Sequence, residues 1–239
     1  MISVCMATYN GEKYIREQME SILCQLGQED EVIVSDDGSK DDTIRILESL
    51  HDERIKISQN EGEHGFVGNF ENALRVAKGD FIFLSDQDDE WMPNKVAVVL
   101  KELKDSDLIV HDAELIDGEG KSMEKNYYSF LHNSSRFLMN LWKTRFLGCC
   151  MAFRKTVLED CLPFPKNTVG HDYWIGMYSL VNYRVKFIPD ILLMYRRHGG
   201  NVSPSSEKSN NSMFYKFYTK RLQLLLSIAV KKIKKRAFH

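Results

Sequence analysis

The chain has 239 residues, of which 43% are hydrophobic, and this suits one globular domain of about 200 residues with an appendage. The formal net charge of −2 favours no class of partner, but residues 213–239 carry eight Lys or Arg and no Asp or Glu. Five cysteines without a CxxC pair argue against a disulfide framework or a zinc site and favour a reducing cytoplasm, and we expect neither a signal peptide nor a membrane span.

Short apolar runs alternate with helical periodicity along the first hundred residues, and this alternation predicts βαβ units around a mainly parallel sheet. The expected strands are Ile2–Thr8, Glu31–Ser35, Ile55–Ser58, Phe81–Leu84, Leu108–His111, 149–154, Arg184–Ile188 and Leu192–Arg196. The expected helices are 15–26, 41–50, 66–77, 94–104, 130–142, 171–181 and 213–236. Residues 199–212 have the composition of a linker.

Three polar clusters follow strands of this predicted sheet. They are "TYNGE" after the first strand, "DDGS" after the second and "SDQDDE" after the fourth. Ligands of open α/β sheets bind beyond the carboxyl ends of strands, near a reversal of strand order. The sequence therefore predicts a binding site where these clusters meet.

The cluster after the fourth strand places Asp86, Asp88, Asp89 and Glu90 within five positions. Such crowding raises the pKa of each carboxyl unless a positive partner lies between them. A calcium loop is excluded, since Trp91 stands where that motif needs glycine. Ordinary capping of the next helix is one remaining interpretation, and a divalent metal shared with phosphate oxygens is the other. No glycine-rich phosphate loop is present, so a nucleotide diphosphate here would need a metal.

Six segments in a fixed order carry a family resemblance: "SVCMATYNGEKYI", "VIVSDDGSKDDT", "FIFLSDQDDEW", "GCCMAFRK", "HDYW" and "YRRHGGNVS". Together they resemble the family-2 glycosyltransferases of GT-A fold over about residues 1–203, and most of all the bacterial rhamnosyltransferase-like branch. The resemblance implies a Rossmann-like α/β domain at 1–200, with a nucleotide-binding half at about 1–105 and an acceptor half at about 106–200. Residues 201–239 would be a linker and a basic amphipathic helix.

The resemblance also implies the residues of the nucleotide and metal sites. Nucleotide contacts would come from Thr8, Tyr9, Glu12, Asp36, Asp37, Gly68, Asn69 and Asp86. Asp88 would bind Mn²⁺ or Mg²⁺ directly, Asp86 would contact the ribose or a water on the metal, and Asp89 would cap the following helix or orient its neighbour. His198 would complete the metal site or touch the diphosphate; alternatively, it is a structural histidine. Turn chemistry at 36–41 and core packing of Tyr9 are alternatives that the sequence leaves open.

Asp172 of "HDYW" matches the family's catalytic base, which takes the proton of an acceptor hydroxyl so that the sugar is transferred with inversion. Burial near Trp174 would raise its pKa, whereas the plain alternative is an N-cap of the helix that follows. His171 stands where the family often has Glu. Arg197, Trp174 and His171 are expected at the phosphates or the acceptor, and Arg197 could pair with phosphate oxygens.

The tail from Met213 to Arg236 is apolar and basic, so it predicts either an interfacial contact with an anionic membrane or a helix docked on the domain. The implied function is transfer of a sugar, from dTDP-rhamnose or a UDP-hexose, to a saccharide that is lipid-linked, in bacterial surface polysaccharide synthesis at the inner face of the membrane. Nucleic acid is not an expected partner. A catalytically silent nucleotide-sugar-binding subunit and a sugar nucleotidyltransferase are the alternatives.

Overall fold

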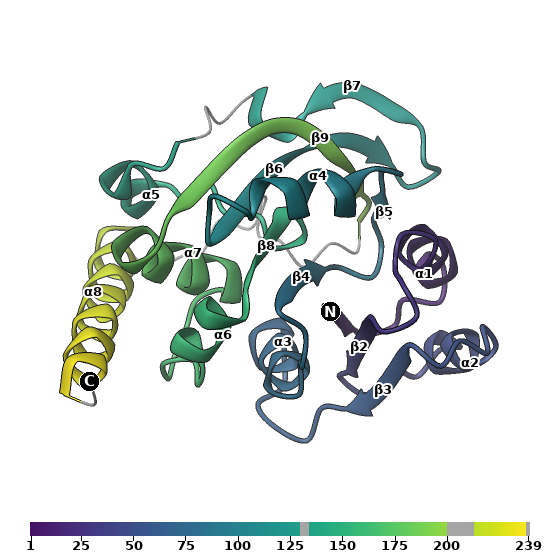
Figure 1. Cartoon of the computed structure of the whole chain (residues 1–239), viewed down its shortest axis with the longest axis horizontal. Coiled ribbons are helices and arrows are strands. Elements are labelled where there is room, and N and C mark those ends of the chain that lie inside the picture. The colour runs from purple at the N-terminus through teal and green to yellow at the C-terminus, as the bar shows by residue number, and fades with distance from the viewer. Residues whose placement is uncertain (130–133, 200–212, 238–239) are drawn as a thin grey trace.

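The computed structural model describes residues 1–129, 134–199 and 213–237, in which strands and helices alternate (Figure 1). The strands are β1 (Ile2–Thr8), β2 (Glu31–Asp36), β3 (Ile55–Gln59), β4 (Phe81–Ser85), β5 (Glu90–Trp91), β6 (Leu108–Asp117), β7 (Ser122–Asn126), β8 (Met151–Arg154) and β9 (Val185–Arg197). The helices are α1 (Ile15–Leu23), α2 (Thr43–Glu48), α3 (Phe66–Arg75), α4 (Lys95–Glu102), α5 (Phe137–Trp142), α6 (Lys155–Cys161), α7 (His171–Asn182) and α8 (Met213–Ala237). Two short 3₁₀ turns are η1 (Tyr127–Ser129) and η2 (Gly148–Cys150).

The first four strands form the parallel part of one sheet, in the spatial order β3-β2-β1-β4. β2 is buried along its whole length, as expected for a parallel strand with helices on both faces. The strand order reverses at β1, because β2 lies on one side of it and β4 on the other. The loops after β1, β2 and β4 therefore lie at one sheet edge, and this confirms the expected fold class of a mainly parallel sheet flanked by helices.

The second half extends the sheet with mixed pairing. β8 runs antiparallel to both β4 and β6, and β9 runs parallel to β6 and antiparallel to β5. The sequence predicts two strands between 184 and 196, but the structure has one long strand whose pairing with β6 shifts register. This strand lies beside β5, so residues after 190 come back to the loop that follows β4.

Several elements differ from the sequence prediction. β7 is largely exposed and polar and β5 has two residues, so neither carries a periodic apolar signal. α6 is a helix of seven residues that the sequence analysis does not predict. β6 continues to Asp117, well past the expected end at His111. α5 begins at Phe137; the first residues expected for this helix, 130–133, lie outside the described part of the chain.

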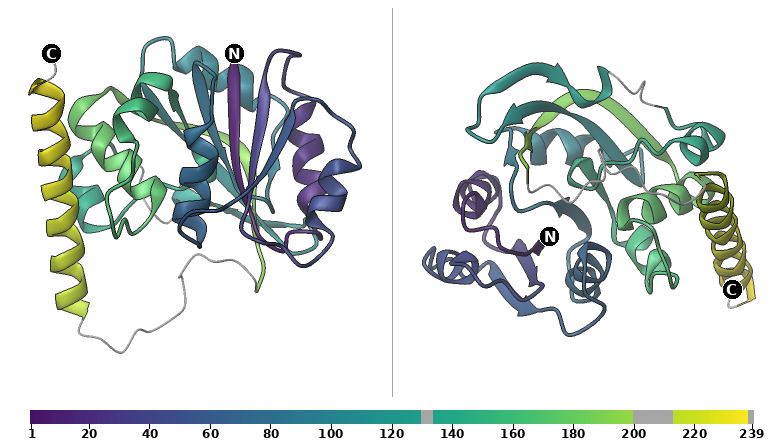
Figure 2. Two further views of the ribbon diagram at one scale, coloured as in Figure 1. Left: turned by 90° about the horizontal axis from the view of Figure 1, so that it is seen from below. Right: turned by 180° about the vertical axis from the view of Figure 1, so that it is seen from behind.

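α8 packs along one end of the molecule, beside α7 (Figures 1 and 2). Leu224 and Ile228 of α8 are buried, and the Lys231 ammonium donates hydrogen bonds to the carbonyls of Asp160, Cys161 and Leu162, each at 2.8 Å. The structure therefore contains the docked helix that the sequence leaves open as the alternative to a membrane contact. Within the described residues, no helix has the length and apolar character needed to cross a membrane.

Candidate functional site

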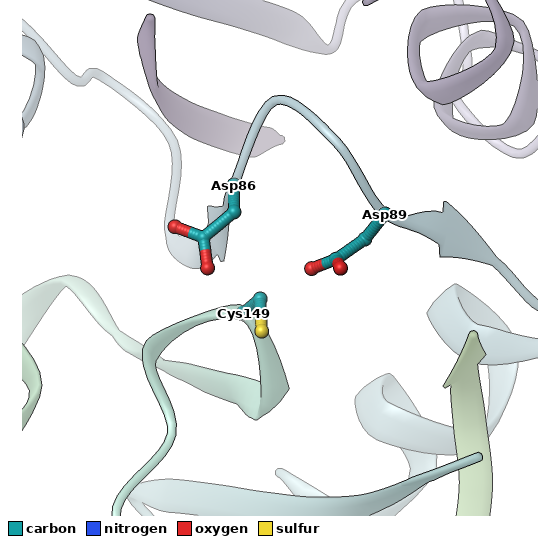
Figure 3. A group of neighbouring side chains, drawn as sticks. All are labelled: Asp86, Asp89 and Cys149. Atoms are coloured by element: carbon teal, nitrogen blue, oxygen red, sulfur yellow. The ribbon is translucent and has the colours of Figure 1, made fainter. Parts of the chain in front are cut away.

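Three side chains meet where β4 ends. We call residues 86–90, which follow β4 and include the first residue of β5, the acid loop. Asp86 and Asp89 turn their carboxylates toward the thiol of Cys149 in η2 (Figure 3), and one oxygen or sulfur atom of each lies within 4.8 Å of the others. The antiparallel pairing of β8 with β4 places η2 directly beside the acid loop.

The acid loop carries more negative charge than its surroundings balance. Burial raises the pKa of Asp86 to about 7, and the charge of Asp88 adds to the effect. Burial likewise raises the pKa of Asp89, whose Oδ2 has no hydrogen-bond partner among the described residues. An unpartnered buried carboxylate oxygen is costly, so this loop favours a bound cation.

One expected role of Asp89 is wrong. Capping of the next helix is excluded because α4 begins only at Lys95. The Asp89 carboxylate instead accepts a hydrogen bond from the backbone N–H of Arg196 at 3.0 Å. Asp89 therefore joins the acid loop to the end of β9.

Lys95 is a buried cation beside the acid loop. Its ammonium donates to the carbonyl of Cys149 at 2.8 Å and lies 4.2 Å from the centre of the Trp91 ring. Burial lowers the pKa of Lys95 to about 8. Because the Lys95 ammonium donates to a backbone carbonyl, the carboxylates of the acid loop stay available to a further cation.

The donor atoms suit a hard divalent ion. Carboxylate oxygens are preferred by Mg²⁺ and Mn²⁺, and a nearby imidazole nitrogen is compatible with Mn²⁺. Burial and the neighbouring carboxylates raise the pKa of Cys149 well above its usual value, so its sulfur stays protonated and is a poor ligand. The residues present therefore fit Mg²⁺ or Mn²⁺ held by oxygen atoms.

His198 and Asp88 are brought together from distant parts of the chain. The distance from His198 Nε2 to Asp88 Oδ2 is 2.8 Å, and the imidazole packs on the Tyr14 ring with centroids 5.0 Å apart. Asp88 and His198 thus form a second donor pair next to Asp86 and Asp89. Asp86, Asp88 and His198 are the three residues that the sequence predicts for a metal site, and Asp89 lies beside them although the sequence gives it no metal role.

Arg196 is a residue of the site that the sequence did not reveal. It is 2% exposed, and its guanidinium donates to the backbone carbonyl of Asp88 at 2.8 Å and to Glu17 at 2.7 Å. The guanidinium also lies 4.7 Å from the centre of the Tyr14 ring. Arg196 therefore clamps the acid loop to α1. In "RRH", the sequence gives no sign of which arginine points inward.

Arg197, the arginine chosen from the sequence, is exposed at the end of β9. Its charge lowers the pKa of Tyr127, whereas the larger effect of burial and the charge of Asp172 raise it. Arg197 and Asp172 therefore both lie within electrostatic range of the Tyr127 hydroxyl.

Asp172 lies in the first turn of α7, and its Oδ1 accepts a hydrogen bond from the backbone N–H of Tyr173 at 2.7 Å. Burial raises its pKa to about 6, and its charge is among the causes that raise the pKa of Asp86. A Cβ atom at Gly148 would lie 2.6 Å from His171 Nε2 and 3.7 Å from Asp172 Cβ. η2 thus contacts the acid loop through Cys149 and the start of α7 through Gly148.

His171 is buried and stacks on Phe70 with ring centroids 3.8 Å apart. Burial lowers its pKa to about 3, so the imidazole is neutral, and neither ring nitrogen has a partner among the described residues. Trp174 is 1% exposed and donates its indole N–H to the carbonyl of Cys161 at 3.1 Å. Trp174 is therefore a core residue in this structure, in contrast to its expected acceptor contact.

The two carboxylates after β2 have different surroundings. Asp36 is buried and accepts hydrogen bonds from Thr8, from the hydroxyl and N–H of Ser39 and from the N–H of Gly38. Its lone pairs are used inside the turn, as the turn interpretation predicts. Asp37 accepts hydrogen bonds from segment 60–65 and so attaches it to β2.

The loop after β1 is tied to the acid loop and to α2. Tyr9 is 55% exposed, and its backbone N–H and carbonyl both bond the side-chain amide of Gln87, at 2.9 and 3.0 Å. This exposure excludes core packing of the Tyr9 ring. Glu12 accepts a hydrogen bond from the N–H of Asp42 and so caps the start of α2.

Gly68 and Asn69 lie in the first turn of α3, near the sheet edge at the end of β1. A Cβ atom at Gly68 would lie 1.8 Å from the backbone carbonyl oxygen of Glu63, so only glycine fits there. Asn69 donates its side-chain amide to the carbonyl of Thr8 at 3.1 Å, and its buried Oδ1 has no partner in the described chain. The amide oxygen is thus a buried acceptor at the sheet edge.

Comparison with known proteins gives consistent results. The family model described as glycosyl transferase family 2 matches residues 3–162. The chain is 28% identical over 249 residues to Escherichia coli WfgD, described as a UDP-Glc:alpha-D-GlcNAc-diphosphoundecaprenol beta-1,3-glucosyltransferase, covering 100% of this chain and 96% of that protein. It is 27% identical over 214 residues to a Campylobacter jejuni GalNAc(5)-diNAcBac-PP-undecaprenol beta-1,3-glucosyltransferase, covering 85% of this chain and 68% of that one.

Among solved structures, S. aureus TarS 1–349 in complex with UDP-GlcNAc superposes with a TM-score of 0.71 at 26% identity. The match covers 96% of this chain and 66% of that chain. The chain therefore spans nearly the full length of the E. coli protein but about two thirds of the C. jejuni and TarS chains.

Proposed function

The chain belongs to the family-2 glycosyltransferases and has the expected GT-A fold, and from this premise we propose that it transfers a hexose from a UDP-hexose to a lipid-linked saccharide with inversion. Two relatives described as glucosyltransferases acting on undecaprenol-linked sugars support this class of acceptor. They also favour a UDP-hexose over the dTDP-rhamnose that the branch resemblance suggests, because the E. coli relative's description names UDP-Glc.

Asp172 is the proposed general base. Its raised pKa, about 6, leaves the carboxylate ionised at neutral pH yet basic enough to accept a proton from an acceptor hydroxyl. The hydroxyl oxygen then attacks the anomeric carbon while the nucleoside diphosphate leaves from the opposite face, and the configuration inverts. The hydrogen bond from the backbone N–H of Tyr173 to Oδ1 orients the carboxylate and leaves Oδ2 as the oxygen that would take the proton.

Asp86, Asp88 and His198 are the proposed residues that hold Mn²⁺ or Mg²⁺. Asp89 is added to this set because its Oδ2 has no partner in the part of the chain that the structure describes. Arg196 holds the loop that carries these aspartates. The metal would supply positive charge to the leaving diphosphate. The nucleotide pocket would be shaped by the turns that are hydrogen-bonded to Thr8, Asp36 and Asp37. The proposed contacts of the base and ribose are Tyr9, Gly68, Asn69 and Asp86.

The proposed halves of the domain remain about 1–105 for the nucleotide and 106–200 for the acceptor; the proposed linker, 201–212, lies outside the described residues. We place the enzyme at the cytoplasmic membrane face, where a lipid-linked acceptor would be found. His171, next to Asp172, and the exposed Arg197 are the proposed contacts of the acceptor or the phosphates.

The observation that supports the proposal best is the convergence of the acid loop, His198 and Asp172 on the two sides of η2. The test is transfer from UDP-glucose, with UDP-galactose, UDP-N-acetylglucosamine and dTDP-rhamnose in parallel, to an N-acetylglucosaminyl-diphosphate-lipid analogue. We expect one UDP-hexose to give product of inverted anomeric configuration by NMR. Retained configuration, or pyrophosphate release from nucleoside triphosphate and sugar phosphate in place of transfer, would overturn it.

A further inference from the structure

The face of α8 that points away from the molecule is apolar. Leu224 and Ile228 are four residues apart and buried, so they mark the inner side of the helix. Leu222, Leu226 and Ile233 fall on the opposite side and are 58%, 56% and 68% exposed. A docked helix normally exposes polar side chains, so this stripe indicates a second surface that α8 contacts.

α5 adds apolar side chains next to this stripe. Leu138 and Trp142 are 75% and 71% exposed, the largest exposed fractions among the big apolar residues of the described chain. Arg221 of α8 donates hydrogen bonds to the carbonyls of Leu141 and Trp142, so the two helices touch. Both helices lie at the same end of the molecule, far from α1 and α2 (Figures 1 and 2). We call the exposed side chains of α5 and α8 the apolar end face.

The sequence around the apolar end face is basic. Residues 134–158 contain Arg136, Lys143 and Arg145 among their cations and no Asp or Glu, and residues 213–239 contain eight cations and no acid. The rest of the chain carries the compensating negative charge. In these two stretches of sequence apolar side chains alternate with Lys and Arg and there is no acid, and this composition matches an anionic lipid surface better than a neutral or acidic one.

The apolar end face adjoins the acceptor side of the site. The hydroxyl of Tyr173 donates to the carbonyl of Leu141 in α5 at 3.4 Å, and Tyr173 follows Asp172 directly. The same carbonyl accepts a bond from Arg221 of α8. α5, α8 and the start of α7 therefore meet at one atom, and Tyr173, which follows Asp172 in sequence, reaches the apolar end face.

We propose that the apolar end face docks on an anionic bilayer and thereby presents Asp172 to an acceptor held in that bilayer. The bilayer contact rests on the exposed surface, and only the presentation of Asp172 rests on the proposed function. α8 then has two roles, because its inner side completes the core while its outer side contacts lipid.

The test is sedimentation of the full chain with vesicles of phosphatidylcholine, with and without phosphatidylglycerol. We expect binding to the anionic vesicles that weakens as salt rises. Trp142→Ser with Leu226→Ser should lower the partition coefficient roughly tenfold or more. Its control is Val76→Ser with Met123→Ser, which changes side chains that are 54% and 43% exposed on other elements and should leave partitioning unchanged.

The electrostatic part of the test uses the double variant Lys143→Glu with Lys220→Glu. We expect each substitution to weaken binding to anionic vesicles by at least roughly fivefold. Lys101→Glu with Lys104→Glu, at exposed lysines at the end of α4 and just beyond it, is the charge-matched control and should change little. Equal binding of the end-face variants and their controls, or no binding by the unaltered chain at low salt, would overturn the proposal.

A second copy of the chain is the competing occupant of the apolar end face. Sedimentation velocity over a range of concentrations measures whether the chain forms a dimer. Lipid docking would be overturned if the unaltered chain dimerises without binding vesicles and the double variant Trp142→Ser with Leu226→Ser is monomeric. Transfer to a water-soluble acceptor is measured in parallel and should be unchanged in the end-face variants. Vesicle binding without any transfer would defeat the proposed function and leave the docking surface standing.

Discussion

Asp172 combines two properties that a general base needs. It is ionised at neutral pH, and burial raises its pKa to about 6, so the carboxylate is more basic than an exposed aspartate. We expect Asp172→Asn to lower transfer by about 10³-fold or more while the affinity for UDP changes less than about twofold. Measurement of turnover and of UDP binding by calorimetry decides between a base and a structural residue, since loss of binding would reassign Asp172.

The same residue sets a pH dependence. Below about pH 6 the carboxyl of Asp172 becomes protonated and cannot accept the acceptor's proton, so the turnover rate should fall tenfold per pH unit on the acid side. In the unfolded chain this carboxyl ionises near pH 4, whereas in the folded chain it ionises only near pH 6. The free energy of unfolding therefore falls as pH rises from about 4 to about 6. Asp172→Asn should therefore melt no lower than the unaltered chain at pH 8. A pH-independent rate between 5 and 7 would contradict the role.

Arg196 acts on the site through the backbone. It bonds the carbonyl of Asp88, the carboxylate of Asp89 and the carboxylate of Glu17, and it is almost fully buried. Arg196→Met removes the side-chain bonds, so we expect weaker Mn²⁺-dependent UDP binding, by roughly tenfold, and a lower melting temperature. Glu17→Gln keeps the bonds to the acid loop and is the matched control. Equal UDP affinity in the two variants would contradict the clamp.

At the scale of elements, the segment between β3 and α3 is held by Asp37 and Gly68 together. Asp37 accepts the N–H of Gly65, which has φ = 100°, and Gly68 packs against the Glu63 carbonyl. Gly68→Ala forces its Cβ into that carbonyl, so the segment must shift; we expect weaker UDP binding and a melting temperature several degrees lower.

Gly27→Ala is the control for this change, because its Cβ would make only an ordinary contact, 3.5 Å from Asp30 Oδ2. Thermal melts and UDP titrations of both variants check the prediction. Unchanged affinity in Gly68→Ala would show that the segment does not touch the nucleotide.

The parallel strands of the first half are predictable because each is a continuous apolar run between turn residues, as in β1 and β4. β7 and β5 are polar or very short and give no such signal, and Pro189 interrupts the apolar pattern of β9. The sequence predicts a polar edge beyond β1, β2 and β4, and the structure brings these loops together. Pairing across long separations, such as Arg196 with Glu17, has no local signature and needed the fold.

At the scale of the whole molecule, the sheet brings an acidic loop from the first half against η2 and the end of β9 from the second half. Asp86 and Asp88 could be selected from the sequence because two carboxylates after a strand form a recognisable pattern. The burial of Trp174 could not be predicted from the sequence, because an aromatic side chain next to a site residue in sequence can face either the site or the core. The family resemblance supplied Asp172, and the structure adds its position across η2 from the acid loop.

We propose that the acid loop binds a divalent ion and, through it, the diphosphate of the donor. The most direct measurement is calorimetric titration of the full chain with UDP in Mn²⁺, in EDTA and in Mn²⁺ with Asp88→Asn. If the acid loop holds the metal, UDP binds in Mn²⁺, and this binding is lost in EDTA and strongly weakened in the variant. Equal UDP affinity under all three conditions would contradict it.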